Sequence, residues 1–349
     1  MSLHMTHETL RLALRDPLRI ARDEHLGETA ATTVIVELHD DRFPGIVGVG
    51  EGCPDRYYGE TPDTMAAVFP LLLAAIGEPD ASEAGLIAAE LAMAEAIGGH
   101  GAAKCAVDIA LHDLFGKANG TPVHALRGLS ADIPPTDFTI GIDAPAIVAQ
   151  RAARAAAFPA LKIKLGGRAD LATLEAVREV FSGPIRVDAN TGWQPEEAVA
   201  LLPHLDRLGV ELIEQPFPAR RLDQLRWLQE RSSLPIVADE SCVFPEDLDG
   251  LVGVVDGVNV KLAKCGGIGP SKRMLERARE LGCRTFLGCM EETQVGIAGS
   301  AVVASLAEWI DLDGCLLLAD DPFEGLELGP DHRWRLSTSP GLGLSRRPA

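Results

Sequence analysis

The stretch "PIRVDANTGWQPEEAVALLPHLDRLGVELIEQP" (residues 184–216) decides the fold class. It begins with a short β-rich run that ends near Asp188 and continues through a segment rich in Ala, Leu and Glu, which is typical of a helix. A second β-rich run then ends near Glu214. A strand, a helix and a strand in this order predict a βαβ unit with parallel strands.

From residue 136 onward the same alternation continues along the chain. The β-rich runs lie at residues 136–142, 161–167, 184–190, 210–216, 235–241, 257–264, 284–290 and 312–318, and helical segments separate them. Eight parallel units predict a closed barrel rather than an open sheet. We therefore expect an α/β fold with a (β/α)₈-type barrel over residues 126–320.

The first 125 residues have a different rhythm. Strand-like runs come first and helical patterns follow, at residues 9–20, 32–40 and 44–52 for the strands and 62–77, 83–97 and 101–118 for the helices. Strands followed by helices predict a separate α+β unit over residues 1–125. The tail, residues 321–349, is too short for another domain, and we expect it to pack back on the N-terminal unit.

Composition limits the classes of partner and the compartment. Asp and Glu outnumber Lys and Arg by 51 to 32, and the net charge of −19 argues against binding to nucleic acid or to anionic membranes. The chain contains no uncharged apolar run of about 18 residues, and its start lacks the apolar core of a signal peptide. Seven cysteines without CxxC spacing indicate reduced thiols and a cytoplasmic protein. The oligomeric state stays open, with a homo-oligomer among the alternatives.

Charged residues fall at the ends of five neighbouring barrel runs. Lys164, Asp188, Glu214, Asp239 and Lys261 each close a β-like run, and they recur about every 25 residues. This spacing matches one strand, one helix and two loops, so each charge recurs at the same structural level. Because the C-terminal ends of the strands form the active-site face of such barrels, we expect all five groups to converge on one mouth.

Three of these groups are carboxylates on adjacent strands. Asp188, Glu214 and Asp239 would repel one another strongly unless a cation neutralised them. An all-oxygen ligand set without His or Cys favours Mg²⁺. The alternative is that each carboxylate caps the helix that follows it. Three acidic residues in the same register, between lysine-bearing strands, favour the metal site.

The lysines suit proton transfer on two opposite faces of a substrate. Lys164 and Lys261 lie four strands apart in a predicted ring of eight, so they would face each other across the mouth. One lysine could remove a proton and the other could return it from the opposite side. Lys162 points to the same face as Lys164 and would add a second positive charge. The alternative for "KIK", an exposed edge strand, conflicts with its apolar flanks. We expect Lys264, three residues beyond Lys261, to lie in a loop.

These motifs resemble the enolase superfamily, within its muconate-lactonising-type subgroup. The matching segments are "KIK" (162–164), "DAN" (188–190), "EQP" (214–216), "DES" (239–241) and "VKLAKCGG" (260–267). The resemblance spans the barrel, and it implies that the N-terminal unit is a capping domain. It also implies that the three carboxylates bind Mg²⁺ and that Lys164 and Lys261 are an acid/base pair. The metal would hold a substrate carboxylate and stabilise an enediolate, with Asn190 and Glu240 supporting the ligands.

The last predicted strand of the barrel helps to distinguish among the reactions that the subgroup catalyses. "WIDLDGCLLL" carries Asp311 and Asp313 two residues apart, which would place both at the mouth. Such a pair resembles the dipeptide epimerases, in which it holds the α-ammonium of the substrate. "GCMEET" (288–293), which contains Met290, resembles the same group. The alternative is that both aspartates are solvated residues at an exposed strand start.

The resemblance therefore implies Mg²⁺-dependent epimerisation of the C-terminal residue of a dipeptide, with L-Ala-D/L-Glu as the default substrate. The alternatives are an N-succinylamino acid racemase and an o-succinylbenzoate synthase, whose substrates offer no ammonium to an aspartate pair. A barrel that serves only for binding is a further alternative, although all five chemical positions are filled.

The resemblance implies that two loops of the capping domain meet the substrate's side chains, and we place these loops at residues 20–27 and 52–60. Arg22 or Arg56 could pair with a substrate carboxylate, and either could instead be a solvated loop residue.

Overall fold

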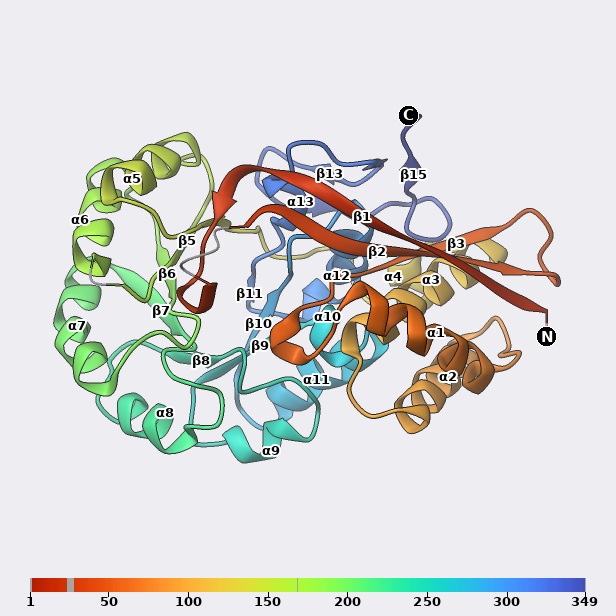
Figure 1. Cartoon of the computed structure of the whole chain (residues 1–349), viewed down its shortest axis with the longest axis horizontal. Helices are drawn as coiled ribbons and strands as arrows, with labels where there is room; N and C mark the ends of the chain where they lie inside the picture. Colours follow the sequence, from red (N-terminus) through yellow and green to blue (C-terminus); the bar gives the residue numbers. More distant parts are fainter. Residues whose placement is uncertain (1, 24–27, 168, 349) are drawn as a thin grey trace.

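The computed structural model describes residues 2–23, 28–167 and 169–348. Within these residues, the N-terminal unit contains a three-stranded antiparallel sheet and the helices that cover it (Figure 1). The strands are β1 (Leu3–Leu18), β2 (Glu28–Asp40) and β3 (Val47–Gly52), and the helices are α1 (Pro62–Ile76), α2 (Glu83–Ala96), α3 (Gly101–Ala118) and α4 (Val123–Leu126). The predicted strands and helices are thus present, and β1 begins earlier than the predicted run.

Close packing of α3 on the sheet depends on glycines in β3. A Cβ atom on Gly48, Gly50 or Gly52 would lie 2.0–2.2 Å from a backbone carbonyl oxygen of α3. Because glycine alone leaves this space, the alternating "GVGEG" pattern allows the helix backbone to lie directly on the strand. The helix is buried along nearly its whole length as a result.

The second unit is the predicted barrel. In the described part of the chain, its eight strands are parallel and lie in sequence order. They are β4 (Phe138–Ile140), β5 (Leu161–Lys164), β6 (Ile185–Asp188), β7 (Val210–Glu214), β8 (Ile236–Ala238), β9 (Gly257–Lys261), β10 (Arg284–Gly288) and β11 (Trp309–Ile310). A parallel bridge between Thr136 and Ile310 joins the first and last strands and closes the ring. The predicted fold class is confirmed.

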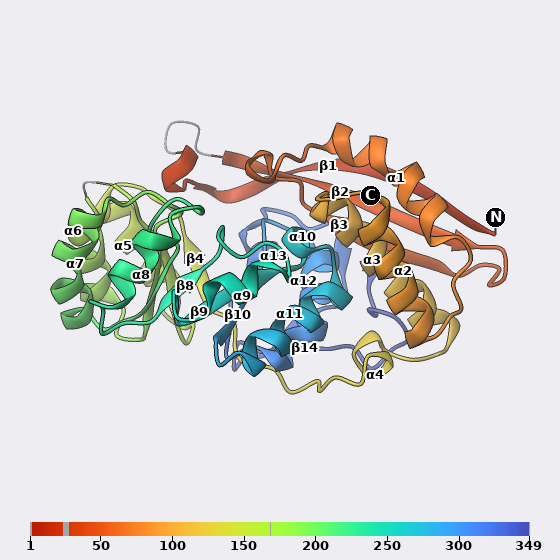
Figure 2. The same cartoon turned by 90° about the horizontal axis from the view of Figure 1, so that it is seen from below.

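The helices of the barrel surround its strands (Figure 2). They are α5 (Pro145–Arg154), α6 (Asp170–Val180), α7 (Pro195–Arg207), α8 (Leu222–Gln229), α9 (Asp247–Leu251), α10 (Leu262–Cys265), α11 (Ile268–Glu280), α12 (Gln294–Val303) and α13 (Gly314–Leu317). Three short 3₁₀ segments are η1 (Ala21–Asp23), η2 (Arg56–Tyr58) and η3 (Ala304–Leu306), and the C-terminal strands are β12 (Phe323–Glu324), β13 (Glu327–Leu328), β14 (Trp334–Arg335) and β15 (Ser345–Arg346). No helix in the described residues is long and apolar enough to cross a membrane.

The eighth strand differs from the prediction. The run at 312–318 was expected to be a strand, but the strand is the two-residue β11 before it, and Gly314–Leu317 forms helix α13. Gly314 is packed so tightly that a Cβ atom would lie 2.2 Å from the carbonyl oxygen of Met290. The chain therefore turns at Asp313, and its apolar leucines belong to a helix.

Carboxylates of the N-terminal unit cap two helices of the barrel. Glu51 of β3 accepts hydrogen bonds from the backbone N–H of Thr293 and of Gly296, at the start of α12. Asp108 of α3 accepts one from the N–H of Ile268, the first residue of α11. Because unpaired N–H groups at a helix start favour a negative charge, these contacts fix the N-terminal unit to the barrel. The segment η1 (Ala21–Asp23), which follows β1, lies over the barrel (Figures 1 and 2).

Candidate active site

The strand ends bring the five predicted residues together. Lys164, Asp188, Glu214 and Lys261 are the last residues of β5, β6, β7 and β9, and Asp239 directly follows β8. Lys164 pairs laterally with Asp188, and Asp188 with Glu214, so these side chains leave the barrel at one level. All five residues are buried.

The three carboxylates form a compact group. One oxygen from each of Asp188, Glu214 and Asp239 lies within 4.8 Å of the oxygens from the other two. Lys164 Nζ lies 2.7 Å from Asp188 Oδ2, and Lys261 Nζ lies 3.0 Å from Asp239 Oδ2. The two lysines thus contact different members of the group, and they come from strands that are four apart in the ring.

Burial and neighbouring charges set the protonation of the carboxylates. Burial alone would raise the pKa of Asp188, but Lys164 and Lys162 hold it below its ordinary value. Burial acts in the same way on Asp239, and Lys261 and Lys264 hold its pKa well below the usual range. Burial and the charge of Asp188 raise the pKa of Glu214 to about 7. Glu214 is therefore the member whose charge is least compensated by the protein.

Burial and neighbouring charges have the opposite effects on the pKa values of the lysine ammonium groups. Burial would lower the pKa of Lys261, but the Asp239 carboxylate outweighs it and raises the pKa. For Lys162, burial is outweighed by Asp311 and Glu214, and its pKa lies well above the ordinary value. A divalent cation on the carboxylates would remove much of this attraction.

Lys162 lies inside the barrel and is 1% exposed. Its Nζ lies 2.9 Å from Asp311 Oδ2 and 3.3 Å from Asp188 Oδ2. It also lies 2.8 Å from Glu214 Oε2, although the angles there are not those of a hydrogen bond. Lys162 therefore links the carboxylate group to the aspartates that follow β11.

Asp311 and Asp313 are both buried, so the alternative of an exposed strand start is wrong. Asp311 accepts hydrogen bonds from Lys162 Nζ and from Thr139 Oγ1, while Asp313 Oδ2 accepts one from the N–H of Thr139 at 2.6 Å. Burial and the nearby charge of Asp311 raise the pKa of Asp313 well above its usual range. A further cation beside this pair would relieve that repulsion. Met290 lies half-buried beyond β10, next to Gly314.

Asn190 and Glu240 lie beside the metal-ligand candidates. The N–H of Asn190 donates to Asp188 Oδ1 at 2.9 Å, and Asn190 Nδ2 donates to Glu240 Oε1 at 3.4 Å. Asn190 and Gln215 have positive φ angles of 38° and 34°. Such backbone conformations are costly for residues with side chains and concentrate at functional sites.

The capping-domain arginines have different surroundings. Arg22 of η1 forms an ion pair with Glu240, and its guanidinium lies 4.3 Å from the ring centre of Tyr57. Arg22 Nη2 also lies 3.5 Å from Asp55 Oδ2. Arg56 is exposed. Of the predicted loop at 20–27, residues 24–27 lie outside the described residues.

Sequence reasoning missed two polar residues beneath the carboxylates. Lys264, expected in a loop, is a buried residue of α10, and its Nζ donates to Asp239 Oδ1 at 2.5 Å. Asn259 of β9 is fully buried, and its Nδ2 donates to Glu214 Oε1 at 2.8 Å. The alternation of β9 was the available signal, because Asn259 lies two residues before Lys261 and faces the same side.

The residues present fit a magnesium ion. The ligand candidates are all oxygens, and buried oxygens without a hydrogen-bond partner remain around them, on Asn190, Glu214, Glu240 and Asn259. Buried acceptors of this kind require a cation or a donor. Asp188, Glu214 and Asp239 would therefore hold the ion.

Addition of Mg²⁺ is expected to stabilise the folded protein. A ligand that binds only the native state adds RT ln(1 + [L]/Kd), which is about 2.7 kcal/mol at 100 times Kd. We expect the melting temperature, followed by calorimetry, to rise with Mg²⁺ and to fall when a chelator is added. An unchanged melting temperature at millimolar Mg²⁺ would count heavily against a metal in this site.

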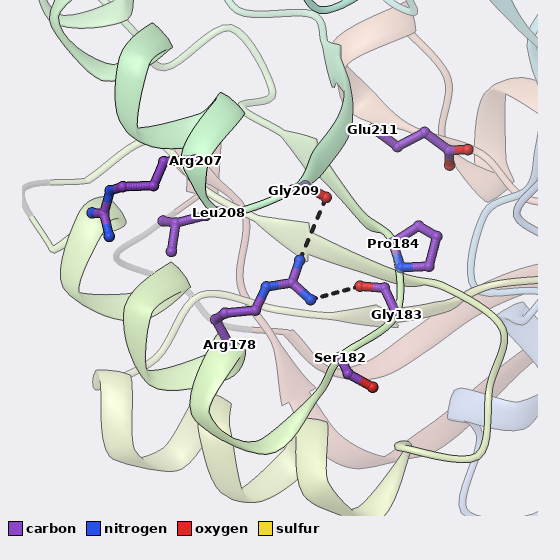
Figure 3. Close-up of a pocket in the computed structure, with 8 residues that line it drawn as sticks. All are labelled: Arg178, Ser182, Gly183, Pro184, Arg207, Leu208, Gly209 and Glu211. Carbon is purple, nitrogen blue, oxygen red and sulfur yellow. Dashed lines mark hydrogen bonds between the residues drawn. The ribbon is translucent and has the colours of Figure 1, made fainter.

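An open cavity of about 490 Å³ lies at the N-terminal ends of β6 and β7, and Figure 3 shows the residues that line it. Its lining includes Arg178, Pro184 and Gly209, and the last two directly precede β6 and β7. Arg178 donates to the carbonyl oxygens of Gly183 and Gly209, so it ties two loops together. Because active sites of this fold lie at the C-terminal strand ends, this cavity is separate from the site.

Comparison with known families assigns both units. Residues 4–128 match the model described as "Mandelate racemase / muconate lactonizing enzyme, N-terminal domain". Residues 146–349, more than half of the chain, match "Enolase C-terminal domain-like". The chain belongs to the enolase superfamily. Its similarity to members of this superfamily extends over nearly its whole length.

Three similar proteins are informative. An L-Ala-D/L-Glu epimerase from Bacteroides thetaiotaomicron is 35% identical over 99% of this chain and 88% of its own. A dipeptide epimerase from Enterococcus faecalis, solved with Mg and L-Leu-L-Tyr, has a TM-score of 0.90 and 32% identity, covering 99% of this chain and 100% of its own. An N-succinyl Arg/Lys racemase from Bacillus cereus also has a TM-score of 0.90, with 28% identity over 99% of this chain and 96% of its own.

Proposed function

We propose that this protein is an isomerase that epimerises the C-terminal residue of a dipeptide in a Mg²⁺-dependent reaction. The observation that carries the proposal is the arrangement at the strand ends. Two buried lysines contact different carboxylates of one compact group, and a pair of buried aspartates follows β11. The similar proteins named as dipeptide epimerases support the same conclusion.

In this proposal Lys164 and Lys261 act on the α-carbon of the C-terminal residue. One lysine, as the free amine, takes the α-proton, and the other, as the ammonium, donates a proton to the opposite face. Mg²⁺ held by Asp188, Glu214 and Asp239 supplies positive charge next to the substrate carboxylate while the α-carbon loses its proton. Asn190 and Glu240 orient the neighbouring side chains.

The other end of the dipeptide would lie near Asp311 and Asp313. Their two buried carboxylates have one ammonium neighbour, Lys162, within hydrogen-bond distance of Asp311. A substrate ammonium would therefore add the charge that this pair lacks. Met290, which lies beside α13, would line the same end of the site.

The side-chain preference is a finer proposal. L-Ala-D/L-Glu is the default substrate, with Arg22 and Arg56 as the candidates to receive a side-chain carboxylate. Arg22 already pairs with Glu240 and Asp55, whereas Arg56 is exposed. We further propose a cytoplasmic location, which the seven free thiols support.

A panel of L,L-dipeptides in D₂O with Mg²⁺ tests the reaction class. We expect deuterium to appear at the α-carbon of the C-terminal residue, together with the L,D-product, and both are visible by proton NMR. The N-terminal α-carbon should keep its proton, because in this proposal the carboxylate beside the metal belongs to the C-terminal residue.

An N-succinylamino acid racemase is the second candidate, because a solved racemase of this type matches the fold equally well. N-succinylamino acids therefore belong in the same panel. If these racemise while every dipeptide stays inert, the roles of Asp311 and Asp313 as an ammonium site are wrong. Reaction of a cyclohexadiene precursor instead would indicate o-succinylbenzoate synthesis.

A further inference from the structure

Each carboxylate of the metal site has one oxygen that is committed to a fixed protein donor. Asp188 Oδ1 accepts from the N–H of Asn190 at 2.9 Å, and Glu214 Oε1 accepts from Asn259 Nδ2 at 2.8 Å. Asp239 Oδ1 accepts from Lys264 Nζ at 2.5 Å. The three donors come from separate positions, yet each binds only one oxygen of its carboxylate.

The second oxygen of each carboxylate faces a buried lysine. Asp188 Oδ2 is next to Lys164, and Asp239 Oδ2 is next to Lys261. Glu214 Oε2 faces Lys162 without hydrogen-bond geometry. The three carboxylates are thus arranged in the same way, with one oxygen held by a fixed donor and the other next to a lysine of β5 or β9.

The position of Lys264 is determined by its surroundings. Besides Asp239 Oδ1, its Nζ donates to the backbone carbonyl oxygens of Asp239, Cys242 and Asn259, at 2.7–2.9 Å. Its side chain is 1% exposed. An ammonium has three N–H donors, and here four oxygens surround them, so the charge is fully solvated by protein. Such a group cannot reorient toward substrate, and it can only hold Asp239 in place.

Asn259 is confined mainly by packing, and among the described residues its side chain makes one hydrogen bond, to Glu214. It lies in the middle of β9, and β10 makes room for it through Gly288, where a Cβ atom would lie 2.8 Å from Asn259 Oδ1. The amide therefore has little freedom to rotate, and its Nδ2 stays directed at Glu214. Orientation of a ligand carboxylate by such a partner raises metal affinity.

We propose that Lys264 and Asn259 are positioning residues that occupy one oxygen of Asp239 and of Glu214 and so present the other oxygen to the divalent cation. The inference rests on the metal site that the proposed function uses. Metal affinity is measured without substrate, however, so a failure here is distinguishable from a failure of the dipeptide assignment.

Calorimetric titration of the full-length protein with Mg²⁺ tests the proposal. We expect Lys264→Met and Asn259→Ala each to raise the Kd for Mg²⁺ by about 10–100-fold, the range typical of partners that orient metal ligands. Lys272→Met is the matched control, because Lys272 is a half-buried residue of α11 whose ammonium pairs with Glu276. Its Kd should equal that of the unmodified protein.

Stability is measured on the same samples to separate positioning from a general structural role. A lower melting temperature in the absence of metal together with an unchanged Kd in both variants would overturn the proposal. Asn259→Ala removes no charge and is expected to fold, so it decides the question if Lys264→Met does not fold. If Asn259→Ala also fails to fold, these side chains are structural supports and the proposal is wrong.

Discussion

Replacing Glu214 by glutamine is expected to abolish Mg²⁺ binding and to reduce kcat/KM by on the order of 10³-fold or more. A metal supplies several kcal/mol of transition-state stabilisation, and each 1.36 kcal/mol changes the rate about tenfold. The amide keeps the shape of the side chain but removes the charge that the cation requires. Glu214 is the informative ligand because its charge is the least compensated, as its raised pKa of about 7 indicates.

Calorimetry with Mg²⁺ and steady-state kinetics with the best dipeptide check this result together. Glu276→Gln is a suitable control, because it makes the same change at a partly exposed position of α11, where Glu276 pairs with Lys272. Full activity of Glu214→Gln at millimolar Mg²⁺ would contradict the assignment of this residue as a ligand.

The second large effect concerns the lysine pair. Lys164→Ala and Lys261→Ala should each lower the rate of epimerisation by about 10²–10⁴-fold, the contribution typical of a positioned acid or base. Either substitution removes proton transfer on one face, and epimerisation requires both faces. Mg²⁺ affinity should persist, because neither lysine is a ligand.

Lys272→Ala serves as the control for these variants, and circular dichroism checks that they fold. Rates are measured in both directions, from the L,L- and from the L,D-dipeptide. Full epimerase activity in either lysine variant would show that this lysine is not an essential acid or base.

The strand-end residues could be predicted because charged residues recur at a regular spacing along the barrel part of the sequence. Lys164, Asp188 and Glu214 interrupt apolar runs at equivalent places, and the register of β5, β6 and β7 brings them side by side. The helices of the N-terminal unit could be predicted as well, because α3 is rich in Ala, Leu, Ile and Val, and the structure buries it along nearly its whole length.

Other features depended on tertiary contacts that the local sequence does not reveal. The leucines after Asp313 suit a strand or a helix, and in the structure Gly314–Leu317 is a helix whose first residue packs against the backbone of Met290. Lys264 would have faced away from Lys261 in a longer strand. Because α10 begins at Leu262, the chain turns and carries Lys264 beneath Asp239.

The placement of Lys162 also required the folded structure. The sequence placed it beside Lys164 on one strand face, but not against Asp311, which is far away along the chain. Closure of the barrel between Thr136 and Ile310 brings β11 next to β4 and so brings Asp311 within 2.9 Å of Lys162.

The most direct test of the two-base mechanism is hydrogen exchange in D₂O by each lysine variant, starting separately from the L,L- and the L,D-dipeptide. We expect Lys261→Ala to exchange the α-proton of one isomer only, without changing its configuration, because Lys164 removes and returns hydrogen on a single face. Lys164→Ala should exchange the other isomer only. Exchange of both isomers by one variant would contradict the assignment of the two lysines to opposite faces.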